Sequence, residues 1–95
     1  MAKVWIVTKA RSIDNEDLAV ILGVYDSFDN ALRRVNEEFD ETEDDYINEY
    51  GDFGHKIDAE NHNNGFAEIH CPDAWDECTI RAEEYELNKP TYESI

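Results

Sequence analysis

One stretch of eight residues constrains the fold of this 95-residue chain more than any other. Residues 18–25, LAVILGVY, are apolar at nearly every position. Such a run, rich in β-branched side chains, is typical of a strand that is central in a sheet or buried on both faces. Its length suits a strand, and Gly23 disfavours a helix interior. We therefore expect residues 18–25 to form a buried strand to which the other strands are added.

A helix is predicted directly after this strand. Asp26 and Ser27 supply side-chain oxygens that can cap a helix N-terminus. Apolar side chains then recur at intervals of three and four residues, which places them on one helix face: Phe28, Ala31, Leu32, Val35 and Phe39. The acids that follow lie near the negative end of the helix dipole, where each costs about 0.3–1 kcal/mol. Two alternatives result: a second short helix capped by Thr42, or one long bent helix over residues 27–50.

The N-terminal segment predicts a second strand beside the first. Residues 3–9 are β-branched and aromatic, which favours a strand. Residues 10–17 are polar and turn-like. This turn lets residues 3–9 fold back and pair antiparallel with the apolar strand.

The C-terminal half predicts three more strands. Asn63-Asn64-Gly65 indicates a tight turn, because Asn and Gly tolerate positive φ, so residues 55–71 form a hairpin. Residues 72–77 form a loop or a single helical turn. Residues 78–87 form the last strand, and the shift in their apolar parity predicts a bulge near Glu83-Glu84.

These elements follow the order β-β-α-(α)-β-β-β. The simplest architecture is an α+β two-layer sandwich, in which one or two helices pack on one face of a mostly antiparallel sheet. The length allows one domain with one modest core. We expect this domain to cover residues 1–88 and residues 89–95 to form a short tail.

The formal net charge is -16 at pH 7, and its distribution is uneven. Residues 1–34 hold five acids and five bases, so the whole excess lies in residues 35–95. This charge disfavours direct binding to nucleic acid, whose phosphates would be repelled. It favours solubility, metal cations or a strongly basic protein partner.

Targeting signals and cysteine usage indicate a cytoplasmic protein. No stretch reaches the roughly 20 apolar residues of a membrane span, and the N-terminus lacks a signal-peptide pattern. Cys71 and Cys78 are the only cysteines and are expected to be free thiols, with Cys71 as a small core residue.

No catalytic or metal-binding motif is recognisable. The histidines and cysteines lack zinc-ligand spacing, and the acidic stretch lacks the EF-hand pattern. A strongly negative surrounding raises the pKa of a thiol and disfavours a nucleophilic thiolate. We expect no enzyme activity, no metal and no cofactor.

The acidic band over residues 37–60 is the main candidate for function. It carries eleven acids against Lys56. Carboxylates on a helix are spaced broadly like DNA phosphates, so a protein that grips DNA with Lys and Arg can bind such a face instead. The alternative is a surface that serves only solubility. Together with aromatic anchors, the predicted partner-binding residues are Glu37, Glu38, Asp40, Glu41, Glu43, Asp44, Asp45, Glu49, Asp52, Tyr46, Tyr50 and Trp75.

Trp75 allows two interpretations. It lies in a predicted loop beside Asp73, Asp76 and Glu77. When exposed, it would be an interface anchor with acidic neighbours. When buried, it would cap the edge of the sheet, and we favour this second position.

One junction resembles a pattern in small uncharacterised proteins of bacteria and their phages. The pattern is G-V-[YF]-x-S-x-x-x-A, here Gly23-Val24-Tyr25-Asp26-Ser27-Phe28-Asp29-Asn30-Ala31, with an acidic closing strand, Ala82-Glu83-Glu84-Tyr85-Glu86-Leu87. The size and acidity also resemble phage-encoded DNA-mimic proteins that block restriction or CRISPR nucleases. This resemblance implies an inhibitor in the host cytoplasm that occludes a basic nucleic-acid-binding protein.

Two other functions fit the same sequence. The first is a structural or housekeeping domain, homodimeric through an open sheet edge, whose acids serve only solubility. The second is an immunity protein that neutralises a basic nuclease toxin.

Overall fold

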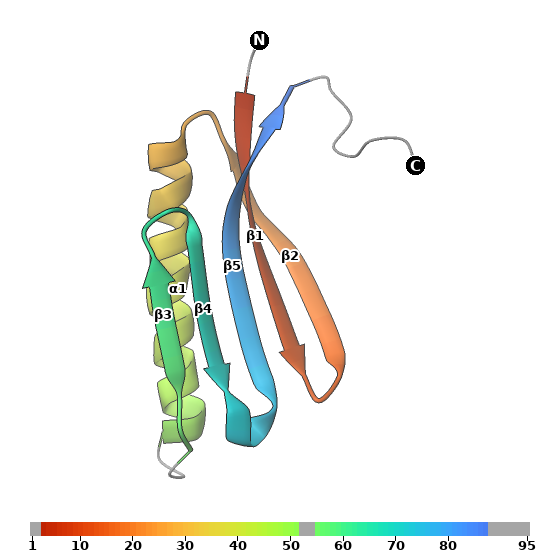
Figure 1. The fold of residues 1–95 in the computed structure, drawn as a ribbon, viewed down its shortest axis with the longest axis vertical. Helices are drawn as coiled ribbons and strands as arrows, with labels where there is room; N and C mark the ends of the chain where they lie inside the picture. The colour runs from red at the N-terminus through yellow and green to blue at the C-terminus, as the bar shows by residue number, and fades with distance from the viewer. Residues whose placement is uncertain (1–2, 52–54, 88–95) are drawn as a thin grey trace.

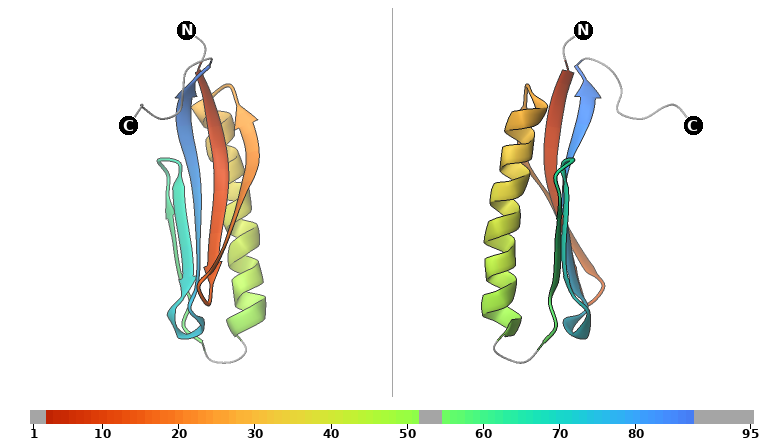
Figure 2. Two further views of the ribbon diagram at one scale, coloured as in Figure 1. Left: turned by 90° about the vertical axis from the view of Figure 1, so that its right-hand side faces the viewer. Right: turned by 60° about the vertical axis from the view of Figure 1, so that its left-hand side comes forward.

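The chain folds into two layers, a five-stranded sheet and one helix that covers one face of it (Figure 1, Figure 2). The computed structural model describes residues 3–51 and 55–87. All strand pairs are antiparallel, which confirms the predicted α+β sandwich. The elements are β1 (Lys3–Ile13), β2 (Glu16–Tyr25), α1 (Phe28–Tyr50), β3 (Asp58–His62), β4 (Phe66–Cys71), a 3-10 turn (Pro72–Ala74) and β5 (Asp76–Glu86).

The strand order is β2-β1-β5-β4-β3. The last strand, β5, therefore lies in the middle of the sheet, between the first strand and the β3–β4 hairpin (Figure 1). Helix α1 connects the two edge strands, β2 and β3, and packs against the sheet as it crosses (Figure 2).

The hydrophobic core lies between α1 and the sheet. Alternate residues of β4 and β5 face the helix, because neighbouring side chains of a strand point to opposite faces. Ala67, Ile69 and Cys71 form the buried face of β4, as expected for Cys71. The buried apolar side chains are Val7, Ala31, Val35, Phe39, Tyr46, Ala67, Ile69, Cys71, Cys78 and Ile80.

Helix α1 is one continuous helix, so the long-helix alternative is correct over residues 28–50. The side chain of Ser27 caps it as predicted, because its Oγ accepts a hydrogen bond from the backbone N–H of Asn30 at 3.2 Å. Thr42 does not start a second helix. It is buried inside α1, and its Oγ1 lies 2.9 Å from Nζ of Lys9 on β1. No helix in the described ranges is long and apolar enough to cross a membrane.

The β1–β2 hairpin is tighter than the sequence indicates. Its turn consists only of Asp14 and Asn15, both with positive φ, 48° and 71°. Such mirror-image turns match the twist of the flanking strands. The strands therefore extend into the predicted turn over residues 10–17. The second turn is confirmed, with Gly65 at φ 92° between β3 and β4.

The prediction that residues 18–25 form a central, buried strand is wrong. Strand β2 lies at the edge of the sheet, pairs only with β1, and exposes most of its side chains. The reason is non-local: the other side of β1 is occupied by β5, which leaves β2 outside. Only the end of β2 that leads into α1 contributes to the core, through Leu22 and Tyr25.

The predicted bulge near Glu83-Glu84 is absent from the ladder between β5 and β1. This ladder runs without a shift from the pair Lys3↔Glu86 to Ile13↔Asp76. The apolar parity changes because Tyr85 and Ile80 are five positions apart, so in a regular strand they lie on opposite faces of the sheet. The irregularity in this part of the sheet lies instead between β1 and β2, at Val7/Thr8. The predicted tail, 89–95, lies outside the described residues.

Candidate partner-binding surface on helix α1

Six carboxylates lie around the solvent side of α1: four point away from the sheet, and Glu43 and Asp45 lie at its flanks. We call them the acidic face: Glu37, Asp40, Glu41, Glu43, Asp44 and Asp45. Glu43 is half-buried and the others are exposed. Residues 37–45 span about 12 Å of helix axis, which gives one carboxylate per roughly 2 Å. Duplex DNA carries one phosphate per about 1.7 Å of its axis. The linear charge density of the acidic face therefore approaches that of DNA.

The acidic face is not neutralised by the nearby cations. Within residues 3–51 and 55–87, none of its six carboxylates forms an ion pair. Three cations of β1 and α1 pair with buried acids instead: Lys9 and Arg34 with Glu38, and Arg11 with Asp76. Arg33 of α1 is exposed and forms none of the ion pairs found in residues 3–51 and 55–87.

Asp76 is the centre of the most extensive polar network between the helix and the sheet. Its side chain is completely buried at the start of β5. Arg11 donates from Nε to Oδ1 at 3.0 Å and from Nη2 to Oδ2 at 2.6 Å. Tyr46 donates its hydroxyl to Oδ1 at 2.6 Å and Tyr50 to Oδ2 at 2.5 Å. We call these four residues the Asp76 cluster. The guanidinium of Arg11 also lies over the ring of Tyr46, 4.7 Å from its centre.

The protonation of the Asp76 cluster follows from these contacts. Burial alone would raise the pKa of Asp76, but the bonds from Arg11, Tyr46 and Tyr50 outweigh it and hold that pKa below its usual value. Burial and the bond to Asp76 raise the pKa of Tyr46, and they raise the pKa of Tyr50 to about 12. The carboxylate is therefore ionised and both phenols are neutral at neutral pH.

Glu38 holds a second network between α1 and β1. It is buried, and its Oε2 lies 2.7 Å from Nζ of Lys9 while its Oε1 lies 2.8 Å from Nη2 of Arg34. Burial would raise the pKa of Glu38, but the hydrogen bond from Lys9 and the charges of Lys9 and Arg34 lower it. Its role is to join the helix to the sheet.

These networks correct part of the predicted binding set. Glu38 and Tyr46 are buried and cannot contact a partner. Tyr50 is half-buried, and its hydroxyl is bound to Asp76. Glu49 is exposed but lies 3.3 Å from Nη2 of Arg11, at the rim of the Asp76 cluster. Asp52 lies outside the described residues. The pattern of acids in the sequence does not distinguish them, because their partners Lys9, Arg11 and Asp76 lie on distant strands.

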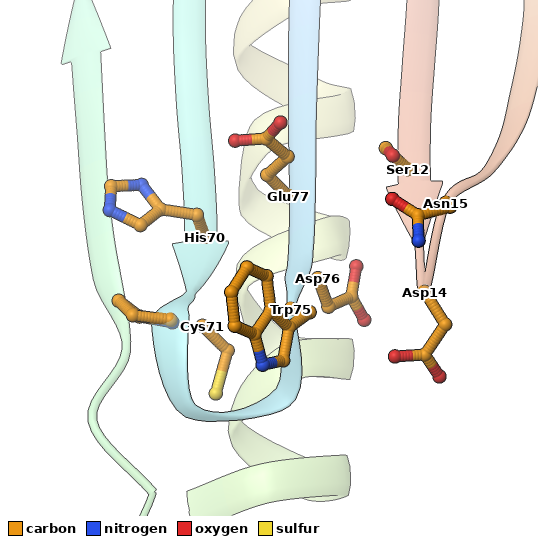
Figure 3. A pocket seen from close by; sticks show the side chains of 9 residues that line it. Ser12, Asp14, Asn15, His70, Cys71, Trp75, Asp76 and Glu77 are labelled. Carbon is orange, nitrogen blue, oxygen red and sulfur yellow. The ribbon is translucent and has the colours of Figure 1, made fainter.

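Trp75 is exposed, so the favoured buried position is wrong. Its side chain is 79% exposed, and its backbone is left-handed, with φ 53°. It ends the 3-10 turn, where its N–H bonds the carbonyl of Pro72 and its own carbonyl accepts from Asp14. Figure 3 shows its indole in front of the strands, with α1 behind them. Trp75 and the acidic face therefore lie on opposite sides of the sheet and do not form one surface.

A shallow hollow of about 780 Å³ lies beside Trp75, between the β1–β2 turn and the β4–β5 connection (Figure 3). Its lining is mixed in character: Ser12, Asp14, Asn15, His70, Cys71, Pro72, Trp75, Asp76 and Glu77. The hollow is open, and its only buried carboxylate, that of Asp76, is bound by the Asp76 cluster.

Metal-ligating and nucleophilic groups form no developed site in the described ranges. The ligand atoms of Glu60, His62 and Glu68 lie within 4.8 Å of one another, because Glu60 and Glu68 are cross-strand partners. These three side chains are at least partly exposed, and we assign no metal to them. Cys71 and Cys78 are buried free thiols, and burial raises the pKa of Cys78, which disfavours a reactive thiolate.

Comparisons with known proteins yield no match: no protein-family model, no curated protein and no solved structure matches this chain. Function is therefore inferred below from charge, burial and geometry alone.

Proposed function

We propose that this protein is a small acidic inhibitor or adaptor that binds a basic nucleic-acid-binding protein through the acidic face of α1. The partner would be a nuclease, or a restriction or CRISPR component, whose DNA-binding groove the acidic face occupies. The observation that carries this proposal is the set of six carboxylates that form no ion pair in the part of the chain that the structure describes, although Lys9 and Arg11 beside the helix and Arg34 on it all pair with buried acids.

The arrangement of the acidic face costs folding energy, which supports a role in binding. Glu37 and Glu41, Asp40 and Asp44, and Glu41 and Asp45 are like-charge pairs four residues apart, each destabilising by about 0.2–0.5 kcal/mol. The last turn of α1 contains no basic residue, so nothing there complements the negative end of the helix dipole.

The proposed mechanism is occlusion. The field of a chain with net charge -16 accelerates encounter with a basic surface. The acidic face then presents its carboxylates from a helix that two buried networks fix to the sheet, so little ordering is needed on binding. A partner that has closed its Lys and Arg side chains around α1 cannot bind DNA at the same time.

The test compares two triple variants of the immobilised protein. The first neutralises the acidic face (Asp40→Asn, Glu41→Gln, Asp44→Asn). The second neutralises three exposed acids outside α1 (Asp58→Asn, Asp73→Asn, Glu77→Gln), so that both variants have the same net charge. Bacterial lysate is applied at about 0.15 M salt, where charges farther apart than roughly 8 Å are screened. Retained proteins are then eluted with salt or duplex DNA and identified by mass spectrometry.

The proposal requires one discrete nucleic-acid-binding protein that is retained by the wild type and by the second variant, displaced by DNA, and lost from the first variant. Equal retention by both variants would show that only net charge matters. A smear of ribosomal proteins that leaves the column at low salt would equally overturn the proposal.

A further inference from the structure

Strand β2 is an exposed apolar edge. It forms the right-hand edge of the sheet in Figure 1, with no described element beyond it. Four of its aliphatic side chains are more than half exposed: Leu18 (68%), Val20 (53%), Ile21 (69%) and Val24 (59%). Its outward backbone N–H and C=O groups face no neighbouring strand in the described structure. An unpaired edge of this kind is a template for another strand.

The opposite edge of the sheet is protected. Strand β3 has five residues and carries exposed acids, Asp58 and Glu60. Short length and charge are the usual means by which sheet edges avoid pairing with other chains. Strand β2 has ten residues, and none is charged from Leu18 to Tyr25. Only its first two residues, Glu16 and Asp17, are acidic.

We propose that β2 pairs antiparallel with β2 of a second copy, which joins two five-stranded sheets into one continuous sheet. This inference goes beyond the proposed function and does not depend on it. The occupant is another copy because of charge: a basic partner is attracted to the acidic face, whereas β2 offers such a partner no carboxylate from residue 18 to 25. For two copies that each carry a net charge of -16, an uncharged edge is where approach is least opposed.

Charge also selects the antiparallel direction. In a parallel pair, Glu16 and Asp17 of one copy would lie beside the same residues of the other, and directly opposed like charges destabilise a sheet. In an antiparallel pair centred on Val20, each Glu16 lies four residues from the centre on opposite sides. The two copies of Glu16 are then about 27 Å apart along the strands, more than three times the screening length of roughly 8 Å at physiological salt.

The antiparallel pair of β2 strands centred on Val20 also has an apolar interface. Val20 lies opposite its own equivalent and Ala19 lies opposite Ile21, so the central pairs are aliphatic. Leu22, which the register between β1 and β2 skips, lies outside these pairs. A shift by one residue would mismatch the two faces of the strand. An interface made mainly by one strand edge is at the small end of specific interfaces, so the dimer should dissociate on dilution.

Sedimentation equilibrium tests the dimer. With rising protein concentration, the mass of the wild type should approach twice 11.0 kDa. Ile21→Lys should remain at 11.0 kDa over the same range and stay folded, because the side chain that it replaces is exposed. Ile47→Lys is the matched control, since Ile47 is an exposed isoleucine (50%) on α1, and this variant should dimerise like the wild type.

Higher salt should strengthen the dimer, because it screens the repulsion between two acidic copies. A nucleic-acid-binding partner would respond in the opposite way, so the two interactions are separable. A wild type that stays at 11.0 kDa at all concentrations, or a dimer that survives Ile21→Lys, would overturn the inference.

The register has its own test. Val20→Cys should form a disulfide-linked dimer under mild oxidation, visible on a non-reducing gel, because the two copies of residue 20 face each other. Ile47→Cys is the control for random cross-linking. Cross-linking of both variants at the same rate would exclude a pair centred on Val20.

Discussion

Helix α1 carries carboxylates on two sides, and their surroundings are opposite. Towards the sheet, Glu38 is buried between Lys9 and Arg34, while Asp76 of β5 binds Arg11 beside it. Away from the sheet, the carboxylates of the acidic face form no ion pair within the described residues. The chain has eight Lys and Arg for 24 Asp and Glu. Lys9, Arg11 and Arg34 thus pair with acids whose buried charge would otherwise be unpaired, which costs far more than an unpaired charge in water.

Arg11→Ala should give the largest loss of stability, because it acts on the buried, paired side of the comparison between Asp76 and the acidic face. It leaves the buried carboxylate of Asp76 without its cation, which is expected to lower the free energy of unfolding by about 3–5 kcal/mol. Urea denaturation followed by circular dichroism measures the loss. Arg33→Ala, at an exposed arginine of α1, should change stability by less than about 0.5 kcal/mol. Equal losses for the two variants would contradict a special role for the Asp76 cluster.

Tyr50→Phe should have a smaller effect on the same cluster. It removes one hydrogen bond to a charged acceptor, and such bonds contribute about 1.5–3 kcal/mol. The value should lie at the lower end, because Tyr50 is half-buried and Tyr46 still binds Asp76. Thermal unfolding at neutral pH measures the change. A variant as stable as the wild type would mean that water replaces the hydroxyl at no cost.

Lowering the pH should weaken the buried contacts of Asp76 and Glu38 and should not weaken the acidic face. The pKa values of Asp76 and Glu38 are lowered in the folded state, so the unfolded chain binds their protons more readily. Their contribution to stability is complete above the ordinary carboxyl pKa, near 4, and declines as pH falls through and below it. Urea midpoints measured from pH 6 to pH 2.5 should show this decline, and Glu38→Gln should reduce its slope. An unchanged slope would assign the acid sensitivity to other groups.

Alkali should act on the tyrosines with the opposite sign. The pKa of Tyr50 is raised from 10.0 to about 12, so its folded phenol holds the proton more tightly than the unfolded one. Its contribution is complete below pH 10 and is lost as pH rises towards 12. Tyr50→Phe should therefore flatten the alkaline loss of stability. The same alkaline profile for wild type and variant would contradict this.

Glu41→Gln should give the smallest change, and in the stabilising direction. It removes two like-charge pairs of the acidic face, with Glu37 and Asp45, each costing about 0.2–0.5 kcal/mol. The gain should disappear at 1 M salt, where the screening length is about 3 Å. Thermal unfolding at low and high salt measures it. A loss of stability at low salt would show that Glu41 has a structural partner.

Local chemistry predicted much of the fold. The cap at Ser27, the spacing of Phe28, Ala31 and Val35, and the turn at Gly65 each involve residues close in sequence, so their geometry follows from the sequence. The exposed part of the site was also predictable, because the acids of α1 have a simple helical spacing.

The errors at β2, Thr42 and Tyr46 involve contacts between distant segments. An uncharged apolar run looks the same at a sheet edge and at a sheet centre, and only the pairing of β5 with β1 makes β2 an edge. Thr42 has the sequence context of a cap, but its contact with Lys9, 33 positions away, places it inside the helix. Tyr46 was predicted to bind a partner as an aromatic anchor. The sequence did not reveal that it is buried, because the acceptor of its hydroxyl, Asp76, lies 30 positions away.

The central position of β5 has a consequence for synthesis. Residues 76–86 leave the ribosome after the other described strands and the helix, yet they fill the space between β1 and β4. Before β5 is available, the β1–β2 and β3–β4 hairpins are not joined to each other. Arg11, Tyr46 and Tyr50 then lack their common hydrogen-bond acceptor, Asp76. Sheets that depend on such distant pairings fold slowly. The described sheet can therefore close only after β5 has left the ribosome, by insertion of this strand between β1 and β4.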